Sequence, residues 1–269
     1  MNEKTILITG ATDGLGKQTA LQLAQLGATI LIHGRNSEKL ENVKNEITAK
    51  TGNEKISTFK ADFQSLSQVK RLAEEVNQNL THLDVLINNA GVFMRRRELT
   101  EDGFEKTFGV NHLAPFVLTN QLLPLLKSSA PARIINISSM GHRFVWLNLN
   151  NLQGERFYWG WIAYCQSKLL NILFTFELAD RLKDSGVYVN AIHPGTVRSN
   201  LTQKASILTG ITATQGAESI VRLATSAEGG AVSGVYFNRF KPAVPSPVAR
   251  NTKLQKELWE KSKALDKLL

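Results

Sequence analysis

The sequence predicts an α/β protein with one doubly wound parallel sheet and helices on both faces, a three-layer sandwich. Two observations lead to this prediction. Short apolar segments rich in β-branched residues alternate with amphipathic segments along the chain, and a glycine-rich turn follows the first apolar segment. Strands that are buried on both faces read as continuous apolar runs, and helices must then cover both sides of the sheet.

The apolar segments predict about seven strands, each short and bounded by polar or glycine-containing turns. They cover residues 5–9, 29–33, 56–60, 83–88, 133–138, 188–193 and 235–238.

The amphipathic segments between these strands predict the helices. Leu15, Leu23, Ala24 and Leu26 are expected to face inward from the first helix, and Ser37 is expected to cap the second. The predicted helices cover residues 14–26, 37–50, 67–78, 100–127, 161–185 and 215–225, with a last helix from residue 252.

The composition agrees with one globular domain over residues 1–269. Hydrophobic residues make up 42% of the chain and charged residues 20%, which excludes disordered and collagen-like proteins. No apolar run approaches the ~18 residues of a membrane helix, and no secretory segment precedes the first strand. The single cysteine, Cys165, cannot form an internal disulfide, so we expect a cytoplasmic location.

The chain is basic, with 32 Lys and Arg against 23 Asp and Glu, a formal charge of +9. Nucleic acid, anionic lipid and phosphorylated cofactors are all compatible with this charge. The one dense cluster, Arg95–Arg97, is typical of a solvated loop, and no nucleic-acid-binding motif accompanies it. We therefore expect no nucleic-acid partner, and leave a weak contact with a membrane surface open.

The turn after the first strand has the pattern of a dinucleotide site. Glycines allow a tight turn, close approach of the backbone to a pyrophosphate and close packing of helix on strand. The helix that follows presents free N–H groups to the phosphates. The alternative is a tight turn without a ligand. The expected cofactor contacts in this turn are Gly10, Thr12, Asp13, Gly14, Leu15 and Gly16.

The end of the second strand favours NADP(H) over NAD(H). An NAD site places an acid there, whereas an NADP site uses a cation for the extra phosphate. The sequence has Arg35 and Asn36, and no carboxylate before Glu38. Asp13 would oppose a phosphate if it pointed toward it, and Arg35 is otherwise an exposed loop arginine.

Tyr164 and Lys168 form a candidate acid/base pair. Of the four tyrosines, only Tyr164 has a lysine four residues later, which places both side chains on one helix face. An ammonium group close to a phenol favours the phenolate, so we expect a lowered pKa for Tyr164. By itself this spacing also describes an ordinary surface pair.

Together with other motifs, the pair resembles the short-chain dehydrogenase/reductase family. The motifs occur in that family's order over essentially the whole chain. They are TGATDGLG (9–16), AD (61–62), NNAG (88–91), Asn111 in VNHLA, SS (138–139), YCQSK (164–168) and HPGTV (193–197). The resemblance implies a Rossmann-like fold and NADP(H)-dependent hydride transfer between a nicotinamide and a carbonyl or alcohol.

The resemblance also implies the catalytic residues. Tyr164 would be the general acid/base, and Lys168 would lower its pKa and hold the nicotinamide ribose. Ser139 would bind the substrate oxygen, with Ser138 as the alternative at the same strand end. Asn111 would anchor a water chain to Lys168.

Further cofactor contacts follow from the same resemblance. Asp62 and Phe63 would lie at the adenine, and the segment after the fourth strand would lie along the ribose region. The segment after the sixth strand would frame the nicotinamide. These two segments contribute Asn89, Ala90 and Gly91, and Pro194, Gly195 and Thr196.

The chain departs from the family pattern at Ala114-Pro115, where relatives often have Gly-His. A proline inside a helix removes one N–H donor and can kink the helix. This puts the helix shape and its packing against a second subunit in doubt, and is not expected to touch the catalytic residues. A homodimer or a homotetramer is compatible with the resemblance.

The stretch between Ser139 and Tyr164 is long and aromatic. Phe144, Trp146, Phe157 and Trp161, together with Met94, are expected to wall an apolar cavity, with core packing as the alternative. This stretch most resembles the retinol dehydrogenase branch, whose relatives include protochlorophyllide reductases. The branch implies a lipophilic aldehyde, ketone or alcohol as substrate.

A different class of function remains possible, namely a regulatory or interaction protein that binds NADP(H) with little turnover. The complete set of Asn111, Ser139, Tyr164 and Lys168 favours the enzyme. Cys165 is expected to be a packed thiol rather than a nucleophile.

Overall fold

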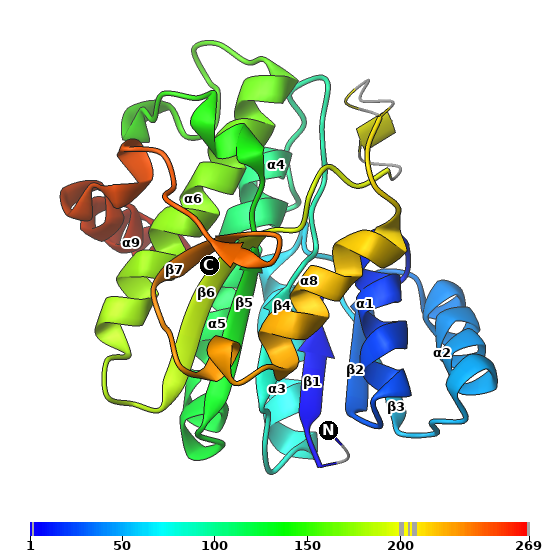
Figure 1. Ribbon diagram of the computed structural model, residues 1–269. Coiled ribbons are helices and arrows are strands. Elements are labelled where there is room, and N and C mark those ends of the chain that lie inside the picture. The colour runs from blue at the N-terminus through cyan, green and yellow to red at the C-terminus, as the bar shows by residue number, and fades with distance from the viewer. Residues whose placement is uncertain (2, 199–201, 204, 206–208, 268–269) are drawn as a thin grey trace.

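The computed structural model describes the chain except residues 2, 199–201, 204, 206–208 and 268–269. Its centre is one eight-stranded sheet with the order β3-β2-β1-β4-β5-β6-β7-β8 (Figure 1). All neighbouring strands are parallel except β7 and β8. The strands are β1 (Thr5–Ile8), β2 (Thr29–Gly34), β3 (Ile56–Lys60), β4 (Val85–Asn88), β5 (Ala132–Ile137), β6 (Val187–His193), β7 (Val235–Asn238) and β8 (Lys241–Pro242).

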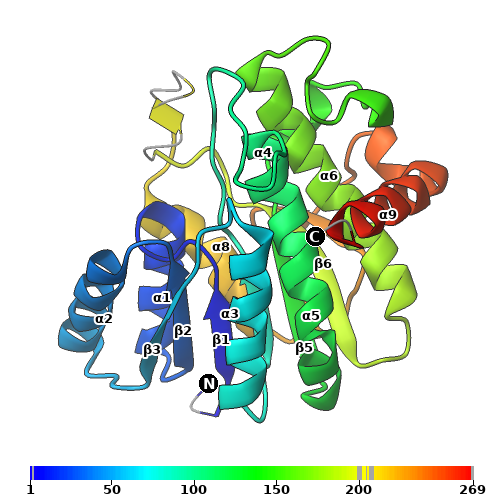
Figure 2. The ribbon, with the colours of Figure 1, turned by 180° about the vertical axis from the view of Figure 1, so that it is seen from behind.

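Helices cover both faces of this sheet, which confirms the predicted fold class. One face carries α1 (Gly14–Gln25), α2 (Ser37–Thr51) and α8 (Ala213–Thr225) (Figure 1). The other face carries α3 (Leu66–Asn79), α5 (Ala114–Ser128) and α6 (Gly160–Arg181), with α9 (Thr252–Lys267) packed outside α6 (Figure 2).

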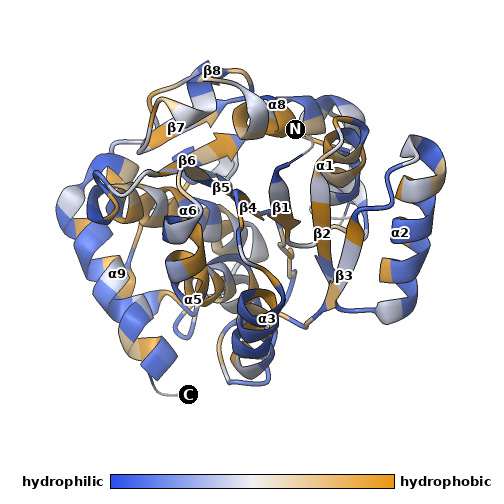
Figure 3. Cartoon of the chain, turned by 90° about the horizontal axis from the view of Figure 1, so that it is seen from below, coloured by the Kyte–Doolittle hydropathy of each residue, from blue (hydrophilic) through white to orange (hydrophobic). Residues whose placement is uncertain are grey.

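Each face of the sheet has its own hydrophobic core. Ile6, Ile8, Ile30 and Ile32 point toward α1, α2 and α8, whereas Leu7 and Leu31 point toward the opposite layer. The period of two along each strand therefore divides the apolar residues between two cores. Polar residues remain on the solvent sides of α2 and α9 (Figure 3).

The predicted helix 100–127 was wrong in its first part. Residues 99 and 105 form an isolated bridge, and the Glu105 carboxylate accepts hydrogen bonds from the N–H groups of Thr107 and Phe108. This capping starts the short helix α4 (Lys106–Phe108), which leads into a π-helix, Gly109–Leu113, and then into α5. A π-helix is rare and is found often at functional sites.

Three smaller predictions also needed correction. Leu26 is 46% exposed, because it follows the last turn of α1 instead of facing the core. The helix predicted to end at 185 ends at Arg181, before a turn in which Gly186 has a positive φ. The eighth strand, β8, was not predicted, because its two residues carry no apolar pattern. Among the described residues, no helix combines the length and apolar character needed to cross a membrane.

Candidate active site

The glycine turn brings β1, α1 and the end of β4 into close contact. Gly10 has φ +64°, and a Cβ atom there would lie 2.8 Å from the Ala90 Cα. A Cβ atom on Gly16 would collide with the Gly10 carbonyl oxygen. The Asn89 side chain donates to the Thr9 and Gly10 carbonyl oxygens at 2.8 and 3.1 Å. Only glycine allows this approach, so the predicted dinucleotide turn has the required backbone shape.

Asp13 lies at the amino end of α1 and acts as its N-cap. Its carboxylate accepts a hydrogen bond of 2.7 Å from the Gly14 N–H. The carboxylate is therefore directed at the helix, and Thr12 packs beneath it, with its Cγ2 close to Gly34. Leu15, the second residue of α1, is partly buried; the amino end of this helix would face the phosphates.

His33 supports the glycine turn from below, a role that the sequence analysis did not predict. Its Nε2–H donates to the Ala61 carbonyl at 3.0 Å, and its Nδ1 accepts from the Gly10 N–H at 3.3 Å. Both bonds require the neutral tautomer protonated on Nε2. Burial lowers the pKa of His33 to about 4, which favours that neutral form.

The residues predicted at the adenosine end lie together at the ends of β2 and β3. Arg35 is exposed directly after β2, and Asn36 caps α2 by accepting from the Lys39 N–H at 2.8 Å. Both carboxylate oxygens of Asp62 accept from Gln64. The ring of Phe63 is buried and stacks on His33 at 4.3 Å, so a contact with adenine would come from its main chain.

The ends of β4 and β6 border the same edge of the sheet. A Cβ atom on Gly91 would lie 3.4 Å from the Asn111 Oδ1 and 3.6 Å from the Lys168 Nζ. After β6, Pro194 is buried and Gly195 has φ +98°, while the Thr196 carbonyl accepts from the Ile211 N–H at 2.9 Å. Residues 89–91 therefore connect the glycine turn directly to the predicted catalytic lysine.

The four predicted catalytic residues converge at this edge. Tyr164 and Lys168 occupy successive turns of α6, with the Lys168 Nζ 5.6 Å from the centre of the tyrosine ring. Ser139 lies on the same side of α6 as Tyr164, since a Cβ atom on Gly141 would lie 3.5 Å from the Ser139 Oγ and 3.6 Å from the Cα of Cys165, the residue after Tyr164. The Lys168 Nζ donates to the Ile137 carbonyl at 3.1 Å, so the buried ammonium is anchored to the end of β5.

The expected lowering of the Tyr164 pKa was wrong. Burial raises the pKa of Tyr164, and the hydrogen bond from Ser139 offsets this only in part. The Lys168 ammonium hydrogen-bonds a carbonyl instead of the phenol oxygen. The tyrosine ring keeps some exposure, so solvent limits the rise. Burial also lowers the pKa of Lys168 to about 8. At neutral pH the pair is therefore a neutral phenol beside an ammonium group.

The structure distinguishes the two adjacent serines. The Ser138 hydroxyl is buried and donates to the Lys168 carbonyl at 2.7 Å, which joins β5 to α6. The Ser139 Oγ lies one residue further, accepts from the Gly141 N–H at 3.2 Å and contacts Tyr164. Ser139 is thus the serine beside the phenol, as the sequence analysis chose.

Asn111 lies in the π-helix and its side chain is fully engaged. The Oδ1 accepts from the Val92 N–H at 2.7 Å, and the Nδ2 donates to the Val92 carbonyl and the Ser167 Oγ, both at 3.0 Å. A water chain to Lys168 would therefore start from the main chain of Asn111. Pro115 lies four residues later and has no N–H for the Asn111 carbonyl. The hydrogen bonds of the Asn111 side chain involve Val92 and Ser167 and not Pro115, so the expectation that Pro115 leaves the catalytic residues unaffected stays a prediction.

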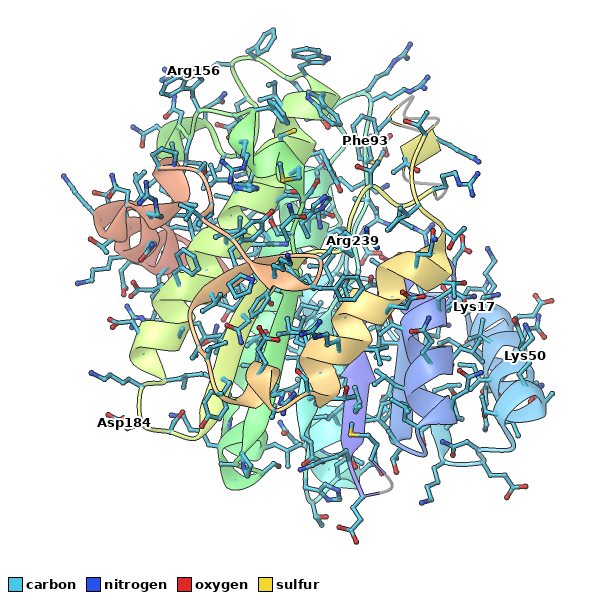
Figure 4. All side chains as sticks on the ribbon, in the orientation of Figure 1. Lys17, Lys50, Phe93, Arg156, Asp184 and Arg239 are labelled. Carbon is cyan, nitrogen blue, oxygen red and sulfur yellow. The ribbon has the colours of Figure 1, made fainter. Side chains whose placement is uncertain are left out.

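Two aromatic rings flank the phenol of Tyr164. Phe93, labelled in Figure 4, is buried and meets it edge-on at 6.0 Å, and Trp161 stacks on it at 6.2 Å. Only Trp161 was predicted here; the position of Phe93, two residues after NNAG, was the available signal. Phe144, Trp146 and Phe157 are exposed to solvent and wall no cavity, because their loop lies outside the core. Cys165 is fully buried, as expected for a packed thiol.

This geometry defines a class of protein: a doubly wound α/β protein with a glycine turn, a tyrosine, a serine and a buried lysine at one edge of its parallel sheet. A family model described as short chain dehydrogenase matches residues 4–207. Human retinol dehydrogenase 11 is 43% identical over 268 residues, covering 96% of this chain and 84% of that protein. Human retinol dehydrogenase 13 is 41% identical over 97% of this chain and 84% of its own length.

Solved structures agree with these matches. An uncharacterized protein from Mycobacterium paratuberculosis has a TM-score of 0.82 at 35% identity, covering 98% of this chain and 94% of that one. A structure from Escherichia coli, described as a short chain dehydrogenase complexed with NADPH, has a TM-score of 0.73 at 29% identity over 90% and 98%. The chain belongs to the short-chain dehydrogenase/reductase family, within its retinol dehydrogenase branch.

Proposed function

We propose that this protein transfers a hydride between NADP(H) and a lipophilic aldehyde, ketone or alcohol. The observation that carries the proposal is the convergence of Ser139, Tyr164 and the buried Lys168 beside the glycine turn. A nicotinamide cofactor and a hydride-transfer reaction follow from the family. The proposal adds the preference for NADP(H), the residue roles and the substrate class.

The residues at the sheet edge fit a bound dinucleotide. Gly10, Gly14 and Gly16 keep side chains away from the amino end of α1, where N–H groups and the helix dipole favour a pyrophosphate. Gly91 keeps the space beside the Lys168 Nζ open, so that this ammonium would hold the nicotinamide ribose. When bound, the nicotinamide would supply or accept the hydride.

The proton would pass through Tyr164. Ser139 and Tyr164 present two hydroxyl groups to a substrate oxygen, and the raised pKa keeps the phenol protonated at neutral pH. A protonated phenol is the form that donates to the oxygen of a carbonyl during reduction. The Lys168 ammonium would stabilise the phenolate that remains, because opposite charges close together favour the charged form.

The preference for NADP(H) rests on Arg35. Arg35 follows β2, and its side chain is exposed where a 2′-phosphate would lie. The Asp13 carboxylate, which could repel that phosphate, instead caps α1. The structures described as complexed with NADPH and NADP show that such relatives bind the phosphorylated cofactor.

Arg35→Ala tests this preference. The variant should weaken NADPH binding by about tenfold or more, the value of one charge-assisted phosphate contact, and leave NADH nearly unchanged. Arg71→Ala, an exposed arginine of α3, is the matched control and should change neither. Titration of both cofactors by fluorescence measures this, and equal losses for NADPH and NADH in Arg35→Ala would contradict the assignment.

The substrate class rests on the relatives' names and on the rings beside Tyr164. Phe93 and Trp161 would contact the apolar part of a carbonyl substrate bound at Ser139. A panel of aldehydes and ketones, assayed with NADPH and NADH, identifies the class. Binding of NADPH without turnover of any of them would favour the regulatory alternative. The cytoplasmic location, and the homodimer or homotetramer, stay predictions.

A further inference from the structure

Four exposed aromatic side chains, which we call the aromatic rim, lie in the segment before α6. The rim consists of Phe144, Trp146, Phe157 and Trp159, whose exposed fractions are 65%, 90%, 70% and 58%. Among the described residues, these are four of the seven large hydrophobic side chains that are exposed. Exposed aromatic side chains concentrated in one short segment commonly mark an interaction site, because folding alone would bury them.

A basic loop lies directly against the aromatic rim. The Arg97 Nε donates to the Gln153 carbonyl at 2.9 Å, and the Tyr158 hydroxyl donates to the Met94 carbonyl at 3.0 Å. A Cβ atom on Gly160 would lie 3.1 Å from the Arg95 Cα. Residues 94–97 therefore run beside residues 153–160, although more than 50 positions separate them.

The combined surface is strongly positive. The one acidic residue within these two segments is Glu155; the neighbouring Glu98 pairs with Lys106 at 3.1 Å, and the buried Glu105 carboxylate accepts from the Tyr158 hydroxyl at 3.2 Å. Arg156 projects at the upper end of the molecule in Figure 4. The arginines of this surface are Arg95, Arg96, Arg97, Arg143 and Arg156.

The aromatic rim adjoins the proposed active site. Its segment lies between Ser139 and Tyr164 in the chain, and Trp161, the second residue of α6, stacks on Tyr164. In Figure 1 this segment forms the upper part of the molecule, beyond the carboxyl ends of the parallel strands. A surface that contacts the aromatic rim therefore faces the end of the molecule where a substrate would enter.

We propose that the aromatic rim and its arginines dock this protein onto an anionic lipid bilayer. Tryptophan and phenylalanine favour the interfacial region of a bilayer, and neighbouring arginines bind lipid phosphates. The positive charge is complementary to an anionic leaflet, and the aromatic side chains project into solvent instead of lining a groove. The proposal requires no transmembrane helix and does not depend on which substrate is reduced.

Vesicle sedimentation tests this proposal with the full chain. The protein should sediment with phosphatidylcholine vesicles that contain phosphatidylserine, and much less with phosphatidylcholine alone. Trp146→Ser combined with Trp159→Ser should weaken this binding on the order of tenfold or more. Arg96→Gln and Arg156→Gln should each weaken it about fivefold, and added salt should mimic their effect.

Leu26→Ser is the matched control. Leu26 is also exposed, but it follows α1 at the opposite edge of the sheet, where the parallel strands begin. This variant should bind vesicles like the wild type. NADPH affinity reports whether each variant is folded. If the double tryptophan variant loses its affinity for NADPH, the two arginine variants are used to test the proposal, because they leave the aromatic residues in place.

Three results would overturn the proposal. The first is a wild-type protein that ignores anionic vesicles. The second is equal vesicle binding by the tryptophan variant, the arginine variants and Leu26→Ser. The third is self-association in sedimentation equilibrium that the tryptophan variant abolishes while vesicle binding is unchanged, which would assign the aromatic rim to a second copy of this chain.

Discussion

The glycine turn and the aromatic rim lie at the same edge of the sheet, yet their side chains are in opposite environments. In the turn, Asn89, His33 and Asp13 each hydrogen-bond the backbone, and no Cβ atom fits at Gly16. In the rim, Trp146 is 90% exposed. Close contacts within the chain determine the shape of the glycine turn, whereas the large apolar side chains of the aromatic rim remain exposed to solvent. The comparison suggests that the turn binds the cofactor and the rim meets an external surface.

Tyr164 lies where the two regions meet, and its removal has the largest expected effect. Tyr164→Phe keeps the ring between Phe93 and Trp161 but removes the proton. Turnover should fall by roughly 10²–10⁴-fold, the range of a lost acid/base group, while NADPH binding persists. Steady-state assays with a responsive aldehyde measure this. Tyr188→Phe, on β6, should behave like the wild type, and near-normal turnover in Tyr164→Phe would place the acid elsewhere.

Acid should destabilise the turn through His33. In the folded protein the pKa of His33 is about 4, below its usual value of 6.5. Between pH 6.5 and 4 the unfolded chain therefore binds a proton at His33 that the folded chain does not bind. Stability should therefore fall as the pH drops from 6.5 toward 4, by roughly 3 kcal/mol for this residue. His112 and His193, also buried with lowered pKa values, add to the same trend.

Urea unfolding across this pH range measures the effect. His33→Gln replaces the titrating ring with an amide that still offers one donor and one acceptor, and should reduce the dependence on pH by the share of His33, leaving the shares of His112 and His193. His82→Gln, the same substitution at an exposed position, is the control for the change of residue type. An unchanged slope in His33→Gln would show that His33 does not stay neutral in the fold.

A smaller effect compares the two regions directly. Gly16→Ala places a methyl group against the Gly10 carbonyl and Asn89, which should cost about 1–3 kcal/mol of stability and weaken NADPH binding. Trp146→Ser, in solvent, should change stability by no more than about 0.5 kcal/mol. Thermal unfolding of both variants checks this. A destabilisation of Trp146→Ser equal to that of Gly16→Ala would contradict the comparison.

The sequence predicted the turn more accurately than the rim, for a physical reason. Gly10 and Gly14 have a positive φ, and Gly16 packs against the Gly10 carbonyl six residues earlier, so these glycines have local causes and their spacing identifies them. Spacing likewise placed Tyr164 and Lys168 on one face of α6. The exposure of Phe144, Trp146 and Phe157 depends on how far their loop lies from the core, which aromatic composition does not record.

Two other features needed the three-dimensional arrangement. The raised pKa of Tyr164 results mainly from burial, and the Lys168 Nζ hydrogen-bonds the Ile137 carbonyl; neither follows from helical spacing. The π-helix around Asn111 breaks a segment that reads as one continuous amphipathic helix. His33 was unpredicted because its partners, Gly10 and Ala61, are 23 and 28 positions away.

The transfer of isotope from cofactor to product tests the central claim most directly. NADPH carrying two deuterium atoms at C4 of the nicotinamide is mixed with a lipophilic aldehyde, and the alcohol is analysed by mass spectrometry. We predict one deuterium on the carbinol carbon with the wild-type protein, and roughly 10²–10⁴-fold slower formation of labelled alcohol with Tyr164→Phe. Oxidation of NADPH without label in the alcohol, or a bound NADPH that leaves every aldehyde unreduced, would contradict the account.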